Sequence, residues 1–141
     1  APDAPEKMKD TQLLWKDIQN GDYEICISDI VIAEIERCKE PKYSFMLSKL
    51  FEIKYVKVIH NIDSDELAKL YAESKGLPPK SKDDARHIAI ATVNNCNAIV
   101  SWNFKHIVNL RAMTVVESVN LQSGYSSLRI LSPTMLLKEE E

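Results

Sequence analysis

The chain has 141 residues and a mass of 16.1 kDa, the usual size of one domain, and we expect a single domain over residues 1–141. Its net charge is −3, whereas a protein that coats nucleic acid is usually basic, so any function on nucleic acid must rest on a local site. No apolar run reaches the ~20 residues that cross a bilayer, and residues 1–9 are unlike a signal peptide. We therefore expect a cytoplasmic protein with no membrane partner.

The three cysteines, Cys26, Cys38 and Cys96, lie far apart in the sequence. Zinc ligands usually come as close-spaced pairs, which this chain lacks. Because each cysteine lies in an apolar stretch, the pattern predicts three buried thiols in a reducing compartment, in preference to a zinc or redox site.

The first half of the chain predicts helices that alternate with short strands. Apolar residues recur at helical spacing, and Gly21 is a natural end for the first helix. Ser28 or Asp29 caps the second helix, and Asp63 or Ser64 caps the fourth. The predicted helices cover residues 3–21, 29–38, 41–51 and 63–76, and β-rich runs at 23–27 and 55–59 predict strands.

The second half continues this alternation. Adjacent prolines predict an irregular loop, and the alanine-rich, nearly all-apolar segment after it predicts a buried central helix. The predicted elements are the loop 77–82, the helix 85–93, the strand 98–100, a helix over about 107–115 and a strand at 128–131.

Strands that alternate with helices predict an α/β fold with a mostly parallel sheet and helices on both faces. In such sheets the functional groups gather outside the carboxyl ends of the strands. Three places are therefore candidates for a functional site: the residues after Ile27, the residues after Val100, and the start of the helix at 85–93.

At the first place, Ser28 ends a strand and Glu34 follows on the next helix, within reach of the strand's carboxyl end. A functional carboxylate is one interpretation of Glu34. The other is a solvated glutamate paired with Arg37 or Lys39, because exposed glutamates are common.

The other two places hold Asp83 and Asp84, and then Ser101 and Asn103. The helix dipole favours aspartate in a first turn, and Asp83 alone satisfies that preference. The residues after Asp84 are so apolar that its side chain should approach the core, where a carboxylate needs a cation or hydrogen-bond donors. A turn explains Ser101 and Asn103, and a site explains them equally.

Together these segments resemble the PIN domain family. The matching segments are Ser28–Ile35, Asp83–Ala91 and Ile99–Phe104, in the family's order, and the resemblance covers about residues 4–133. It implies a three-layer α/β/α sandwich around a central, mostly parallel sheet. It also implies a hydrolase, a ribonuclease dependent on Mg²⁺ or Mn²⁺, of which the VapC-type toxins of toxin–antitoxin pairs are small members. The implied partners are RNA, an antitoxin protein and a second copy in a homodimer.

The resemblance also assigns roles to individual residues. Glu34 and Asp84 match the family's catalytic, metal-binding carboxylates, and Asn103 stands where many members have a further aspartate. Hard divalent ions prefer oxygen ligands, and asparagine offers a carbonyl oxygen without the negative charge, so we expect weakened metal affinity. Ser101 is expected to hydrogen-bond a phosphate or support the site.

The chain departs from the family at its start. PIN domains begin with a short apolar strand that ends in an aspartate and lies in the middle of the sheet, and that strand is missing before the first helix here. An exposed pair of strand edges invites aggregation, so we expect either that the natural chain begins upstream of Ala1 or that a partner or rearranged segment fills the place. The alternative function is a catalytically silent PIN-like interaction module with an incomplete acidic site.

Several neighbours of these carboxylates have two interpretations. His87 shares a helical face with Asp84, and it either assists at the metal or phosphate or is a packed histidine, which we favour. Lys105 either holds RNA phosphate or is a solvated lysine, and the same two interpretations apply to Lys80 and Lys82. Trp102 either stacks on a base or belongs to the core, which we favour.

Overall fold

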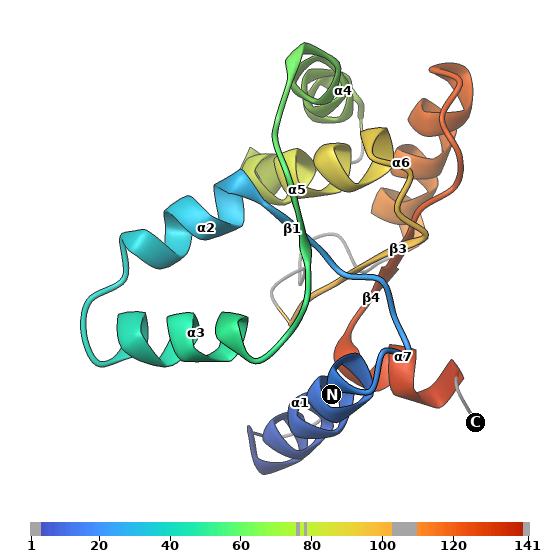
Figure 1. Cartoon of the computed structure of the whole chain (residues 1–141). Coiled ribbons are helices and arrows are strands. Elements are labelled where there is room, and N and C mark those ends of the chain that lie inside the picture. The colour runs from blue at the N-terminus through green and yellow to red at the C-terminus, as the bar shows by residue number, and fades with distance from the viewer. Residues whose placement is uncertain (1–3, 76, 78, 103–109, 140–141) are drawn as a thin grey trace. The chain divides into compact units, whose positions relative to one another are not determined.

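The computed structural model describes residues 4–75, 77, 79–102 and 110–139 (Figure 1). The chain divides into two compact units, residues 1–59 (unit 1) and 60–141 (unit 2), and each is described by itself. Seven α-helices and four short strands occur in the described ranges, and the strands form two parallel pairs. The prediction of a mixed α/β chain with parallel strands is confirmed. None of the helices so described is long and apolar enough to cross a membrane.

Unit 1 is a strand–helix–helix–strand arrangement preceded by a long helix. Its strands are β1 (Cys26–Ser28) and β2 (Val56–Val58), which pair in parallel with Cys26 opposite Val56 and Ser28 opposite Val58. Because parallel neighbours need a long crossover, the chain between them forms two helices. The helices of unit 1 are α1 (Ala4–Gln19), α2 (Asp29–Glu36) and α3 (Lys42–Phe51).

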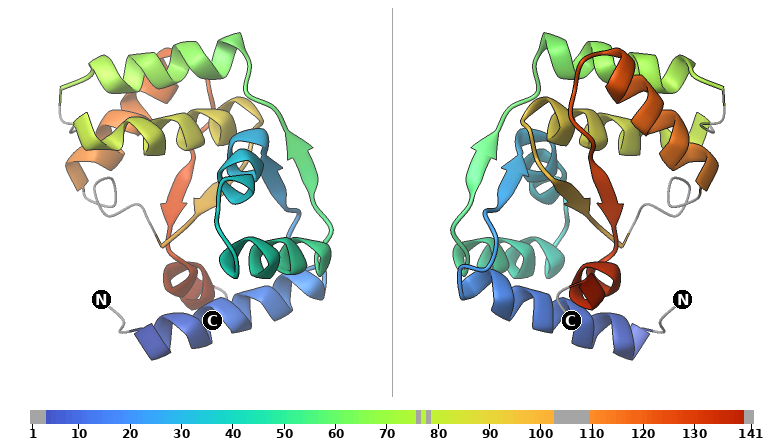
Figure 2. Two further views of the ribbon diagram at one scale, coloured as in Figure 1. Left: turned by 90° about the vertical axis from the view of Figure 1, so that its left-hand side faces the viewer. Right: turned by 90° about the vertical axis from the view of Figure 1, so that its right-hand side faces the viewer.

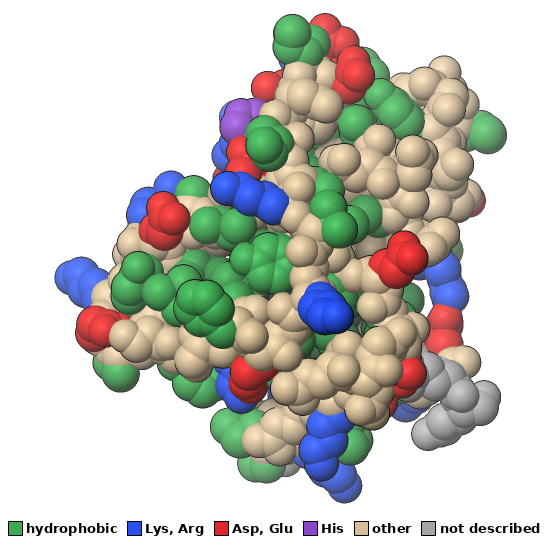
Figure 3. Space-filling view, viewed as in Figure 1, with side chains coloured by type: hydrophobic (Ala, Val, Ile, Leu, Met, Phe, Trp, Pro, Cys, Tyr) green, Lys and Arg blue, Asp and Glu red, His purple; other side chains and the backbone are tan. Residues whose placement is uncertain are grey.

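Unit 1 exposes much of its apolar surface. Helix α3 has no buried residue, and its Phe45 and Phe51 are 57 % and 86 % exposed. Hydrophobic side chains gather over α2 and α3 in the space-filling view (Figure 3). No side chain of α3 is therefore buried within the described structure.

The prediction of three buried thiols is wrong. Cys26 is exposed, Cys38 and Cys96 are half-buried, and none of the three is in a disulfide. Cys26 begins a three-residue strand of a two-stranded sheet, and so small a sheet covers little of its own surface. An apolar local sequence was therefore a poor guide to burial here.

Unit 2 places a second parallel strand pair beside a layer of helices (Figure 2). Ala98 lies opposite Arg129 and Val100 opposite Leu131, with a helix as the crossover. The elements are α4 (Ile62–Glu73), the 3₁₀ turn η1 (Pro79–Ser81), α5 (Lys82–Val93), β3 (Ala98–Val100), α6 (Leu110–Gln122), β4 (Arg129–Leu131) and α7 (Pro133–Glu139).

Helix α5 is the centre of the unit 2 core, which confirms the predicted buried helix. Ile88 and Ala89 are 0 % exposed and pack with Leu67 and Tyr71 of α4. Val116 of α6 belongs to the same buried cluster. An alanine-rich face lets neighbouring helices approach closely, so α5 holds the layer together.

Some predicted element ends were wrong. The cap of α4 is Asn61, which exchanges hydrogen bonds with Ser64 in a capping box. The loop expected to be irregular contains η1, because proline has a fixed φ that suits a helical turn. Helix α6 continues to Gln122, beyond the expected end near residue 115, and α7 was not predicted.

Candidate active site

Ser28 lies where β1 ends and α2 begins. Its side chain is buried, and its Oγ accepts a hydrogen bond from the N–H of Val31 over 3.1 Å. This bond satisfies one of the first-turn amides and sets the start of α2. Glu34 follows on α2 and is exposed. The carboxylate is thus carried by a helix whose N-terminus stands at the carboxyl end of β1.

Asp83 and Asp84 lie in the first turn of α5 and differ in burial. Asp83 is exposed, whereas Asp84 is half-buried and directly precedes Ala85, which is 2 % exposed. This agrees with the expectation that Asp84 approaches the core. A carboxylate partly withdrawn from water gains more from a nearby cation than one in solvent. Asp84 is therefore the better placed of the two to bind an ion.

His87 lies one turn after Asp84 on α5. It is half-buried, between the exposed Arg86 and the buried Ile88. Because residues three apart share a helical face, His87 and Asp84 project from the same side of α5. Both interpretations of His87 stay open, since half burial suits a packed ring and a ring at the edge of a site.

Ser101 directly follows β3. Its N–H donates a 3.0 Å hydrogen bond to the carbonyl oxygen of Leu131, which extends the ladder with β4 by one residue. Ser101 and Trp102 are both half-buried, so the core and stacking interpretations of Trp102 also stay open. Figure 2 shows α5 and β3 running in opposite directions. The first turn of α5 and the carboxyl end of β3 therefore lie toward the same side of unit 2.

The predicted site residues are divided between the two units. Asp84, His87 and Ser101 belong to unit 2, and Glu34 belongs to unit 1. Asn103 and Lys105 lie outside the described residues. Unit 2 thus carries Asp84 and His87 on one face of α5 and Ser101 at the end of β3, and unit 1 carries Glu34.

The donor chemistry suits a hard divalent ion, but the described ligands are few. Glu34 and Asp84 offer carboxylate oxygens, which Mg²⁺ and Mn²⁺ prefer. Within residues 4–75, 77, 79–102 and 110–139, no three His, Cys, Asp or Glu side chains stand together so as to hold a metal ion. The metal site therefore stays a prediction.

Sequence patterns missed a buried polar cluster in unit 2. The hydroxyl of Tyr71, which is 0 % exposed, donates to Oδ1 of Asn120 and lies 3.3 Å from Oγ1 of Thr92. Burial raises the pKa of Tyr71 to about 12, so this phenol is protonated at neutral pH. The cluster joins α4, α5 and α6 and holds the helix that carries Asp84. An asparagine inside a helical apolar stripe was the available signal.

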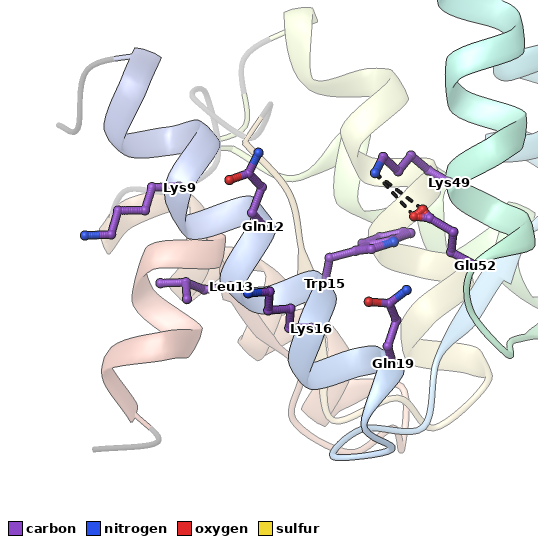
Figure 4. Close-up of a pocket in the computed structure, with 8 residues that line it drawn as sticks. All are labelled: Lys9, Gln12, Leu13, Trp15, Lys16, Gln19, Lys49 and Glu52. Atoms are coloured by element: carbon purple, nitrogen blue, oxygen red, sulfur yellow. Dashed lines mark hydrogen bonds and ion pairs between the residues drawn. The ribbon is translucent and has the colours of Figure 1, made fainter.

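A second missed feature is a lysine-lined pocket in unit 1, formed by α1 and α3 (Figure 4). In the sequence, Trp15 recurs with other apolar residues at helical spacing, which indicates a helix but not a pocket. Its neighbours on α3 could not be known from local spacing, because contacts between helices distant in sequence leave no periodic signal.

The chain matches no protein-family model, no curated protein and no solved structure. The resemblance to PIN domains therefore rests on the three sequence segments alone and stays a prediction.

Proposed function

We propose that this protein is a metal-dependent ribonuclease of the PIN type. The observation that carries the proposal is a repeated arrangement in the two parallel strand pairs. Ser28 ends β1 and leads into the helix of Glu34, and Ser101 follows β3, whose preceding helix α5 carries Asp84 in its first turn. Polar groups thus follow the first strand of each pair, where parallel sheets collect their functional residues.

The proposed fold is a three-layer α/β/α sandwich, which is more specific than the mixed α/β chain with two parallel strand pairs described above. In a three-layer sandwich, the two strand pairs would belong to one central sheet with helices on both sides. The chain would supply Glu34, Asp84 and Asn103 to the acidic site.

Each proposed residue has a chemical task. Mg²⁺ or Mn²⁺, when bound, would polarise the scissile phosphate and lower the pKa of a water. Glu34 and Asp84 would hold and orient the ion, and Asn103 would contribute a neutral oxygen. Ser101 and Lys105 would hydrogen-bond or pair with phosphate oxygens, and cleavage would leave a 5′-phosphate.

The proposed setting is a toxin–antitoxin pair. RNA would be the substrate, an antitoxin protein would restrain the enzyme, and two copies would form a homodimer. A metal bound between carboxylates allows a protein of net charge −3 to act on RNA, because the cation locally reverses the acidic field.

The chain offers matched controls for a cleavage test. Asp84→Asn is compared with Asp83→Asn, its exposed neighbour, and Glu34→Gln with Glu36→Gln on the same exposed helix end. Each variant is incubated with a mixed single-stranded RNA pool, with Mn²⁺ or with EDTA. Loss of a residue that hydrogen-bonds a metal ligand lowers metal affinity or activity roughly 10–100-fold. Loss of a direct ligand should therefore lower the cleavage rate about 100-fold or more.

The double variant asks whether the two carboxylates act on one ion. If they do, Glu34→Gln combined with Asp84→Asn should be little slower than either alone, because members of one catalytic unit are not additive. Cleavage that Asp84→Asn leaves unchanged, with thermal unfolding also unchanged, would contradict the proposal. RNA binding without cleavage would favour the silent interaction module.

A further inference from the structure

The pocket of unit 1 lies between α1 and α3 and has a volume of about 280 Å³ (Figure 4). This is near the lower end of the range for small-molecule sites, and it suits a single small ligand. None of the described residues that line it belongs to the proposed catalytic set. It is therefore a separate feature of the molecule.

The face of α1 that lines the pocket is free of acids. Lys9, Gln12, Lys16 and Gln19 recur every three or four residues and share one face of the helix. The acidic residues of α1 are Glu6, Asp10 and Asp17, and none of them lines the pocket. The α1 side of the pocket is therefore basic and rich in amides, although the overall charge of the chain is negative.

Helix α3 adds an ion pair to the opposite wall. Lys49 Nζ lies 3.3 Å from Glu52 Oε1, and the two side chains are 42 % and 35 % exposed. With Lys9 and Lys16 on α1, the lining carries three cations and one carboxylate, a net charge of +2 (3 − 1). An anionic ligand would therefore be attracted to the pocket.

Trp15 forms the floor between these walls. Its Nε1 is buried and has no hydrogen-bond partner within the described residues. In Figure 4 the indole extends from α1 toward Lys49 and Glu52. A buried N–H without an acceptor is costly and uncommon, and a ligand oxygen would satisfy it. The indole face also offers a stacking surface for a base.

We propose that this pocket binds the phosphate of a nucleotide, either free or within a single-stranded RNA. The Nε1–H of Trp15 and the Lys49 ammonium donate to phosphate oxygens, while Lys16 and Lys9 at the rim attract the anion. The base lies against the indole of Trp15. The donors outnumber the acceptors around the pocket, and phosphate is the common biological ligand that accepts several hydrogen bonds while carrying negative charge.

The first experiment is an NMR titration of the whole chain in EDTA, so that no metal-dependent cleavage occurs. The chain has two tryptophans, and Trp15→Phe identifies which indole N–H signal belongs to Trp15. The probes are inorganic phosphate, a mixture of nucleoside 5′-monophosphates, and an eight-nucleotide single-stranded RNA. The Trp15 signal should move with nucleotide or RNA, and the Trp102 signal should move less.

The probes identify the source of the phosphate. A response to mononucleotides alone assigns a free nucleotide, and a response to RNA alone assigns the strand. A response to both assigns the shared nucleotide unit. No movement of the Trp15 signal with any probe overturns the proposal. Because EDTA is present, a failure of the ribonuclease proposal leaves this result unaffected.

Charge variants supply the second test. A plot of log affinity for RNA against log salt has a negative slope. Lys16→Gln and Lys49→Gln should each make this slope shallower by about 0.7, the value expected for the loss of one phosphate contact on a single strand. Lys42→Gln is the matched control, since it removes a lysine of α3 that does not line the pocket. Glu52→Gln should tighten binding, because it removes the only carboxylate among the lining residues. Equal effects of Lys42→Gln and Lys49→Gln would overturn the pocket as the site.

Discussion

Tyr71→Phe should destabilise unit 2 without changing its core volume. The ring of Tyr71 is 0 % exposed between α4, α5 and α6, and phenylalanine keeps that ring. Only the hydroxyl is lost, together with its hydrogen bond to Oδ1 of Asn120 and its 3.3 Å contact with Oγ1 of Thr92.

The loss of stability in Tyr71→Phe depends on which hydrogen bonds Thr92 and Asn120 keep. Thr92 Oγ1 donates to the carbonyl oxygen of Ile88 over 2.9 Å and keeps that bond in the variant. Asn120 loses the donor to its Oδ1, and its Nδ2 already has no partner within the described residues. A buried polar group that loses its partner costs ~1–3 kcal/mol, so we expect about 2 kcal/mol for Tyr71→Phe.

Replacing both partners should cost less than the sum of the single changes. Asn120→Leu removes the unpaired amide, and Tyr71 can then turn its hydrogen toward Thr92. In the double variant, both polar groups are gone and the site is apolar, which is nearly neutral when shape is kept. We therefore expect the double variant to be no less stable than Tyr71→Phe alone.

Urea unfolding followed by circular dichroism measures these differences. With a slope of ~1–3 kcal/mol per molar urea, Tyr71→Phe should lower the midpoint by about 1 M. Tyr125→Phe, a half-buried tyrosine of the same unit, is the control and should change little. A midpoint that Tyr71→Phe leaves in place, or a double variant whose loss equals the sum of both single losses, would refute this account of the cluster.

Two further outcomes follow from the same structure. Burial raises the pKa of Tyr71 from 10.0 to about 12, and because the folded pKa is the higher one, the stabilisation is present below pH 10 and is lost between about pH 10 and 12. Urea midpoints across this range should fall for the native chain and fall less for Tyr71→Phe. Ser28→Ala removes the acceptor for the Val31 N–H and should lower stability by about 1 kcal/mol in the same assay, whereas Ser28→Gly should cost only a few tenths.

Local signals predicted what is locally determined. Ser28 caps α2 and Ala98–Val100 forms β3, because a cap depends on one turn and a strand core on a short apolar run. The cap of α4 was misplaced for an equally local reason. Asn61 and Ser64 exchange hydrogen bonds, so both residues carry a capping signal and the sequence does not say which one stands outside the helix.

The end of α6 was predicted too early, near residue 115, although Val116 continues the buried stripe. Ala112, Val116 and Asn120 are buried at four-residue spacing, and the amide of Asn120 interrupts the apolar period. Helix α7 had a signal that was overlooked. Ser132 accepts from the N–H of Met135 over 3.2 Å, and Pro133 occupies the first helical position, where proline is favoured.

For the candidate site, too, the positions of single residues could be predicted from their neighbours, whereas contacts between distant segments could not. A strand end and a helix first turn can be recognised from a few neighbours, so the positions of Ser28, Asp84 and Ser101 could be predicted. Whether Glu34 meets Asp84 depends on contacts between segments about fifty residues apart (84 − 34), which no periodicity encodes. A shared ion would make their loss non-additive, and two independent carboxylates would make it additive. The cleavage rates of the single and double variants therefore measure the one relation that sequence patterns cannot supply.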